Sequence, residues 1–123
     1  MIWEVSSSFP VSSIPSFVDD NMMKPFAGIE TGIRRLYIGE MDEKWVDLPE
    51  EKLSLDQLLT GYTINGAKQC AWENVCGSIE VGKSADMVVL DRNLYEIPVE
   101  TIHETEPLIT VFRGEEVYKA AAR

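Results

Sequence analysis

The run GSIEVGKSADMVVLD, residues 77–91, constrains the fold of this chain more than any other stretch. Residues 77–84 match the phosphate-loop pattern GxxxxGK[ST], in which backbone N–H groups and a lysine hold phosphates and a hydroxyl holds magnesium. That pattern has this meaning only between a buried strand and a helix. Residues 72–76 instead resemble a helix end followed by a turn, and residues 87–90, MVVL, are typical of a strand. Nucleotide binding is therefore the least favoured of three functional hypotheses for this chain.

The same run predicts two strands joined by a turn. Residues 78–81 alternate polar and apolar side chains, which is typical of a short half-buried strand. Gly82 and Lys83 then form a turn, and the continuous apolar run of residues 87–90 predicts a strand that is buried on both faces. Asp86 and Asp91 flank this strand, and five positions of extended chain would separate them by roughly 17 Å. We expect them to be turn and strand-end residues.

The spacing in this run resembles the C-terminal hallmark of the metal-dependent amidohydrolase superfamily, with closest similarity to the branch called amidohydrolase type 3. The similarity extends back through residues 53–66 and forward to residues 110–118, TVFRGEEVY, which are similar to the closing TxVxGxxVY hairpin of the family. It is strongest from Leu53 onward. The resemblance implies a segment that follows a catalytic barrel and forms strands of a small β-sandwich beside it.

Helices are expected to precede the strands. Residues 21–36 carry apolar side chains at helical spacing, with Pro25 suited to the first turn. Ser54 and Gln57 form a capping box at the start of a second helix. Thr63 or Asn65 can cap a further short helix that ends before Gly77. The acidic residues 40–52 are expected to form a surface loop.

The C-terminal part is expected to be mostly strand. Residues 97–102 predict one short helical turn, and Gly114-Glu115 predicts a type II′ hairpin turn. We expect Trp72, Phe112 and Tyr118 to lie in the core.

The order of elements predicts an α+β fold, because strands and helices do not alternate as they do in a complete barrel. A whole barrel needs about 250 residues, and this chain has 123. By resemblance, residues 1–74 correspond to the end of a TIM-type barrel, with its last strand, a loop and helices. Residues 75–123 correspond to part of the C-terminal composite β-sandwich domain.

Composition narrows the classes of partner. The net charge of −10 predicts no nucleic-acid partner and no attraction to anionic membranes. No apolar run approaches the roughly 20 residues that span a bilayer, and residues 1–20 do not predict a signal peptide. Cys70 and Cys76 are expected to be buried free thiols of a cytoplasmic protein.

The resemblance implies chemistry for which this chain lacks most of the groups. Members of the family bind divalent metal, such as zinc, through several histidines, often a carboxylated lysine and an aspartate, and they act on small-molecule substrates. Metal lowers the pKa of a bound water and polarises the scissile carbonyl. This chain has a single histidine, His103, without a partner at metal-ligand spacing. We expect a surface or packing residue there, and no cofactor in this chain itself.

Ser8 is the one candidate catalytic position. Residues 6–11, SSSFPV, align with the family motif GSDxPV, so that Ser8 stands where the family has its catalytic aspartate. A serine hydroxyl cannot act as that carboxylate base or as a strong metal ligand. Either the position has lost its role or the parent enzyme uses another group. Asp19 and Asp20 are better explained as a pair at the start of a helix.

Two functional hypotheses follow. In the first, the chain is the C-terminal part of an amidohydrolase and is inactive alone. In the second, it is a non-catalytic structural or interaction domain. Apolar surface left uncovered in such a domain would drive self-association, so a homo-oligomer is expected.

Overall fold

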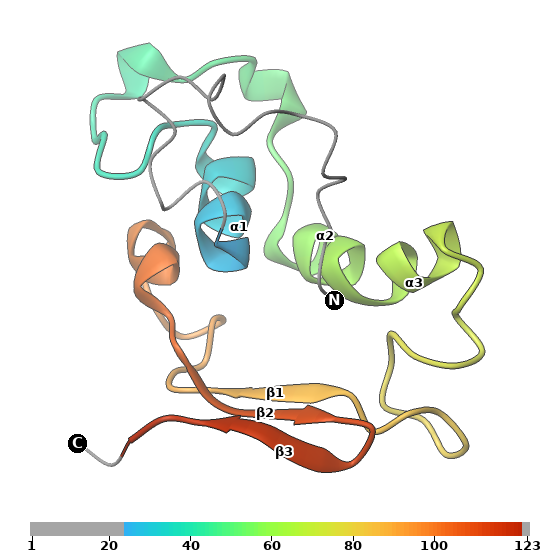
Figure 1. Ribbon diagram of the computed structural model, residues 1–123. Helices are drawn as coiled ribbons and strands as arrows, with labels where there is room; N and C mark the ends of the chain where they lie inside the picture. Colours follow the sequence, from blue (N-terminus) through green and yellow to red (C-terminus); the bar gives the residue numbers. More distant parts are fainter. Residues whose placement is uncertain (1–23, 122–123) are drawn as a thin grey trace, which may run out of the picture.

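The computed structural model of the chain describes residues 24–121, and Figure 1 shows its helices in one layer with a sheet below them. Along the chain, helices α1, α2 and α3 precede strands β1, β2 and β3. The α+β class is therefore confirmed. The predicted strand of residues 1–5 and the loop of residues 6–15 lie outside the described residues.

The first two helices begin where their sequence signals place them. Helix α1, Pro25–Arg34, has a proline in its first turn, where the missing N–H costs no hydrogen bond. Helix α2, Leu55–Thr60, begins with the predicted capping box: Gln57 N–H donates to Ser54 Oγ at 3.2 Å, and Ser54 N–H donates to Gln57 Oε1 at 2.8 Å.

No separately capped helix follows α2. The chain continues through a π-helical turn η5, Gly61–Asn65, directly into α3, Gly66–Gln69. The prediction that Thr63 or Asn65 caps a new helix is wrong, because Gly61 keeps helical dihedrals. The Thr63 hydroxyl donates instead to the carbonyl of Leu59 at 2.7 Å, as Ser and Thr often do inside helices.

Helix α3 ends in a Schellman motif built on a non-glycine residue. Ala71 has a φ of 57°, and its N–H donates to the carbonyl of Lys68 at 3.0 Å. Trp72 N–H donates to the carbonyl of Ala67 at 2.8 Å. These two bonds satisfy carbonyls that the end of a helix leaves without a partner.

The connecting segments are short helical turns. The acidic surface loop is confirmed as an exposed segment with two 3₁₀ turns, η3, Glu43–Trp45, and η4, Pro49–Glu51. A third 3₁₀ turn, η6, Val99–Glu104, confirms the helical turn expected near residues 97–102.

The core lies between α1 and η6. Ile29 of α1 and Ile102 of η6 are buried together with Leu94, and partly buried side chains of α2 pack against them. These apolar contacts bring together parts of the chain more than 60 positions apart and stabilise the helical layer.

The sheet is antiparallel in the order β1-β2-β3, with β1 at Met87–Leu90, β2 at Pro107–Phe112 and β3 at Glu115–Lys119. The predicted hairpin is shifted by one residue. Its turn residues are Arg113 and Gly114, with φ of 52° and 82°. Positive φ at both positions is the type I′ geometry, which matches the twist of the flanking strands. The predicted type II′ turn is wrong.

Both faces of the sheet are open, contrary to the prediction of a strand buried on both sides. Met87, Val88 and Val89 are 36%, 52% and 46% exposed. Among residues 24–121, the helical layer above the sheet in Figure 1 contacts β1 at Leu90, which packs against the core cluster, and leaves the other three residues of β1 exposed. Phe112 and Tyr118 of the sheet, and Trp72 after the end of α3, are also exposed, so their expected core positions are wrong.

Candidate functional site

Residues 77–84 form an internally bonded loop. Lys83 Nζ donates to Ser78 Oγ at 2.6 Å and to Glu80 Oε1 at 3.1 Å. The Ser78 hydroxyl also donates to Glu80, and these contacts lower the pKa of the Glu80 carboxyl. Ser84 N–H donates to the carbonyl of Val75 at 2.7 Å, which closes the base of the loop.

This geometry contradicts two predictions. The lysine that a phosphate loop would use is engaged by a carboxylate, and strand β1 rather than a helix follows it. The nucleotide hypothesis is therefore wrong for this fold. Residues 78–81 also form no strand, because their polar side chains bond within the loop and no second strand lies beside them.

Gly77 lets the loop lie directly on the helical layer. Its φ is +94°, and a Cβ there would come within 2.6 Å of Ala67 Cβ and 3.1 Å of Ile64 Cα. A side chain would therefore push residues 77–84 away from α3.

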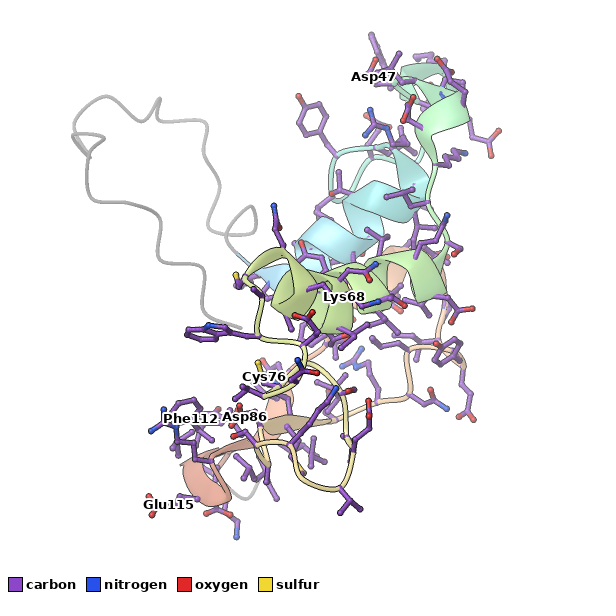
Figure 2. All side chains as sticks on the ribbon, turned by 90° about the vertical axis from the view of Figure 1, so that its right-hand side faces the viewer. Asp47, Lys68, Cys76, Asp86, Phe112 and Glu115 are labelled. Carbon is purple, nitrogen blue, oxygen red and sulfur yellow. The ribbon has the colours of Figure 1, made fainter. Side chains whose placement is uncertain are left out.

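Asp86 and Asp91 hydrogen-bond the two ends of β1 to adjacent segments of the same chain. Asp86 Oδ1 accepts from Arg113 N–H at 2.7 Å and from the Ser84 hydroxyl at 2.9 Å. Asp91 Oδ1 accepts from Glu106 N–H at 3.1 Å. The prediction of turn and strand-end residues is confirmed. Figure 2 shows Asp86 beside Phe112 and far from Asp47, which lies at the opposite end of the molecule.

Asp91 also pairs with a cation. Arg92 donates to Asp91 Oδ2 at 2.9 Å and reaches Glu104 at 3.5 Å. The bonds from Arg92, followed by the one from the Glu106 N–H, hold the pKa of the Asp91 carboxyl below its usual value. The same pairing raises the pKa of Arg92.

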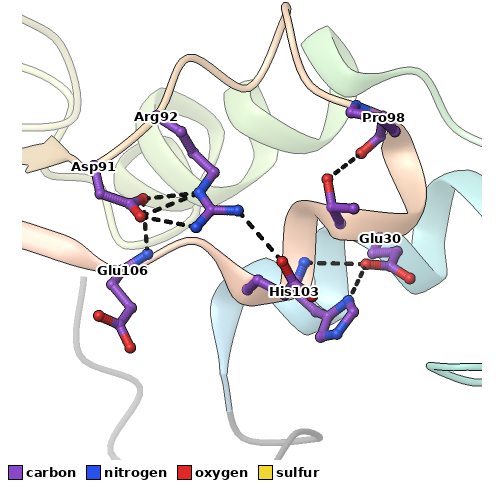
Figure 3. Close-up of polar contacts among 8 residues, drawn as sticks. Glu30, Asp91, Arg92, Pro98, His103 and Glu106 are labelled. Carbon is purple, nitrogen blue, oxygen red and sulfur yellow. Dashed lines mark hydrogen bonds and ion pairs between the residues drawn. The ribbon is translucent and has the colours of Figure 1, made fainter.

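Glu30 is a fully buried carboxylate that ties η6 to α1 (Figure 3). Its Oε2 accepts from His103 N–H at 3.0 Å and lies 2.7 Å from His103 Nδ1. Its Oε1 accepts from Arg34 at 3.1 Å. Charge-assisted bonds of this kind satisfy a carboxylate that burial would otherwise penalise strongly. His103 is thus a packing residue, as expected.

Sequence reasoning missed Glu30, although a signal was present. Glu30 falls four positions after Phe26 and three before Ile33, so it lies within the apolar stripe of α1. Arg34 follows at the i+4 position. A charged residue inside an apolar stripe indicates a buried polar contact, but its partner, His103, is 73 positions away.

The described residues do not fit a catalytic metal. Within residues 24–121, no group of three or more histidine, cysteine, aspartate or glutamate side chains is placed to hold an ion. Cys70 and Cys76 are free, as expected, but neither is buried: Cys70 is exposed at the end of α3, and Cys76 is half-buried. Ser8 lies outside the described residues and stays a prediction. Across residues 24–121, no helix is long and apolar enough to cross a membrane.

The comparisons with known proteins decide the family. A sequence profile of the amidohydrolase family matches residues 14–118. The chain belongs to this family. Imidazolonepropionase of Bdellovibrio bacteriovorus is 33% identical over 69 residues, which is 56% of this chain and 16% of that protein. N-substituted formamide deformylase of Arthrobacter pascens is 36% identical over 66 residues, 54% of this chain and 12% of that protein.

A longer stretch of the chain is similar to a plant protein. Protein LONG AFTER FAR-RED 3 of Arabidopsis thaliana is 28% identical over 92 residues, 75% of this chain and 14% of that protein. The chain thus spans less than a fifth of the length of the curated relatives it matches. No solved structure matches the chain. Amidohydrolases in general use a divalent metal, and the residues described for this chain supply no site for one.

Proposed function

We propose that this chain is the C-terminal portion of a metal-dependent amidohydrolase that hydrolyses non-peptide C–N bonds of a small molecule. The family match over residues 14–118 carries this proposal. Two relatives are named an imidazolonepropionase and an N-substituted formamide deformylase, which favours a small-molecule substrate for the full-length protein. A divalent metal such as zinc would serve as its Lewis acid.

The proposed division of the chain separates helices α1 to α3 from strands β1 to β3, with η6 of the second part packed against α1. Residues 1–74 would form the end of a TIM-type catalytic barrel, and residues 75–123 would form part of a composite β-sandwich. The open apolar faces of β1 and β2 support the second assignment, because a sheet with two apolar faces requires a covering layer on each side.

The chain would be inactive alone in this proposal. Its described polar residues have structural roles. Lys83 bonds within the loop of residues 77–84, and Asp86 and Asp91 bond the ends of β1 to adjacent segments. Glu30 bonds η6 to α1. Metal ligands would come from the remainder of the full-length protein. Ser8, at the position of the family's catalytic aspartate, would leave that position without a base, since a hydroxyl does not accept a proton near neutral pH.

A second candidate is a non-catalytic interaction domain in the cytoplasm that self-associates. The uncovered apolar side chains of the sheet favour it, because large exposed apolar patches mark sites of association. The free cysteines are consistent with a cytoplasmic location. The strongly acidic net charge favours neither nucleic-acid nor anionic membrane partners.

A chimaera tests the leading proposal. The segment of Bdellovibrio imidazolonepropionase that matches this chain would be replaced by the corresponding 69 residues of the chain. Metal content and the rate of hydrolysis would then be measured. We expect a folded chimaera that retains metal and activity, and a loss of both when the chimaera also carries Asp86→Ala and Asp91→Ala. The proposal is wrong if the intact chimaera folds but binds no metal, or if this chain alone binds stoichiometric metal.

A further inference from the structure

Among residues 24–121, no strand pairs with the outer edge of β1 or of β3, and these two edges differ in their charge pattern. Edge strands present unpaired N–H and C=O groups to any strand that can pair with them. At one edge, all five residues of β3 are exposed, including Val117 at 59% and Tyr118 at 48%. At the other edge, β1 carries Asp86 and Asp91 at its two ends.

Strand β3 is complementary to a second copy of itself. Antiparallel pairing about a two-fold axis at Val117 sets Glu115 opposite Lys119 of the other copy, and does so twice. It sets Glu116 opposite Tyr118, so no like charges meet. Within residues 24–121, neither Glu115 nor Lys119 has an ion-pair partner of its own. Opposite charges that face each other across strands stabilise pairing.

The same antiparallel pairing about a two-fold axis is unfavourable for strand β1. Pairing Met87 with Leu90 of a second copy places Asp86 opposite Asp91 at both ends of the strand. Like charges that face each other across strands destabilise the pairing. The two edges are therefore not equivalent, and only the β3 edge is compatible with a symmetric pair.

A bulge lies at the centre of the β3 edge. Glu116 pairs with Val111 and Tyr118 pairs with Thr110, so Val117 has no direct partner on β2. The backbone groups of a bulged residue are left unpaired, and in β3 these groups lie at the proposed two-fold axis.

We propose that β3 is the self-association surface of this chain, joining two copies into one sheet of order β1-β2-β3-β3-β2-β1. This surface specifies the self-association proposed above and rests on it, while the amidohydrolase assignment does not depend on it. The two Glu115–Lys119 contacts set the register. The total charge of −10 on each copy opposes the contact, so added salt strengthens association as it screens this repulsion.

Charge exchange tests the proposal. Sedimentation equilibrium would measure the dimer dissociation constant of the full chain and of four variants: Glu115→Lys, Lys119→Glu, the double variant carrying both changes, and Lys68→Glu. Each single variant sets like charges opposite each other and is expected to weaken the dimer by about tenfold or more. The double variant restores opposite charges and is expected to recover the wild-type dissociation constant.

Lys68→Glu makes the same charge change as Lys119→Glu at an exposed position on α3, and is expected to weaken the dimer much less, because it adds only to the net-charge repulsion. A monomeric wild-type chain overturns the proposal and shows that the bulge protects the edge. A dimer that the single variants do not weaken, or that the double variant does not restore, also overturns it. None of these outcomes bears on the amidohydrolase assignment, which rests on metal and hydrolysis in the chimaera.

Discussion

The helical layer and the sheet are stabilised in different ways. In the helical layer, Ile29 and Ile102 are almost fully buried, and the carboxylate of Glu30 lies beside them with each oxygen bonded. In the sheet, strand β3 is exposed throughout and β1 is more than a third exposed at Met87. The sheet is held by backbone pairing and by the aspartates at the ends of β1.

The difference shows which region is complete within this chain. A small sheet normally gains its stability from a covering layer over at least one apolar face. Helices α1 and α2 already have such cover from η6, whereas β1 packs against the helical core at Leu90 and is exposed at its other three residues. Apolar side chains of the sheet are therefore exposed to solvent within residues 24–121. Substitutions in the two regions should show this difference.

The largest effect is expected in the helical core. Ile102→Ala removes a side chain that is 1% exposed and leaves a cavity against Ile29, so the free energy of unfolding should fall by about 3 kcal/mol. Val88→Ala on strand β1, where the side chain is 52% exposed, should change it by less than about 0.5 kcal/mol. Chemical denaturation followed by circular dichroism measures both. Equal losses would show that the two regions do not differ in burial.

The second effect tests the buried carboxylate. Glu30→Ala leaves His103 N–H and Arg34 without their acceptor, and should cost about 2 kcal/mol because both partners keep some contact with water. Glu30→Gln should cost less, since the amide oxygen can still accept one bond. Glu50→Ala, at an exposed position, is the matched control. If Glu30→Ala is as mild as Glu50→Ala, then Glu30 does not fasten η6 to α1.

The sequence predicted features that depend on neighbouring residues. The capping box at Ser54 and the proline start of α1 are local, and the structure has both. The hallmark run also placed Asp86 and Asp91 correctly at the ends of β1. These features follow from hydrogen bonds or register within a few residues.

Features that depend on residues far apart in the sequence could not be predicted in this way. The apolar run of β1 predicts burial on both faces, but burial depends on layers that residues 24–121 do not supply. The contact between Glu30 and His103 joins positions 73 apart. The hairpin turn moved by one residue because Arg113 takes up a positive φ beside Gly114, which the order of residues alone does not predict.

A third, smaller effect tests the junction between the two regions. Gly77 and Gly82 both have a φ of +94°, but only Gly77 lies against the helical layer. Gly82→Ala should cost about 1 kcal/mol through backbone strain alone. Gly77→Ala should cost about 1 kcal/mol more, because its Cβ would overlap Ala67. Denaturation midpoints that are equal for the two variants would show that residues 77–84 do not pack on α3.

The smallest effect is expected at the end of β1 and depends on pH. The pKa of Asp91 is held below its ordinary value of 3.8 in the folded chain, first by Arg92 and then by the Glu106 N–H. A lowered folded pKa means that the stabilisation is fully present well above pH 3.8 and is lost as the pH falls through the folded pKa. Asp91→Asn keeps an oxygen for the Glu106 N–H but cannot ionise.

The stability difference between the wild type and Asp91→Asn should therefore close as the pH falls below 3.8. Because Asp91 lies at the surface, added salt should reduce this difference. Asp47→Asn, whose carboxylate is 3.8 Å from Arg35 and 82% exposed, should show little difference at any pH. A gap between wild type and Asp91→Asn that stays constant from pH 7 to pH 3 would show that the charge of Asp91 does not hold β1. The end of β1 would then depend on backbone pairing alone. The helical layer would be stabilised by a buried charged side chain, and the sheet would lack any such contribution from Asp91.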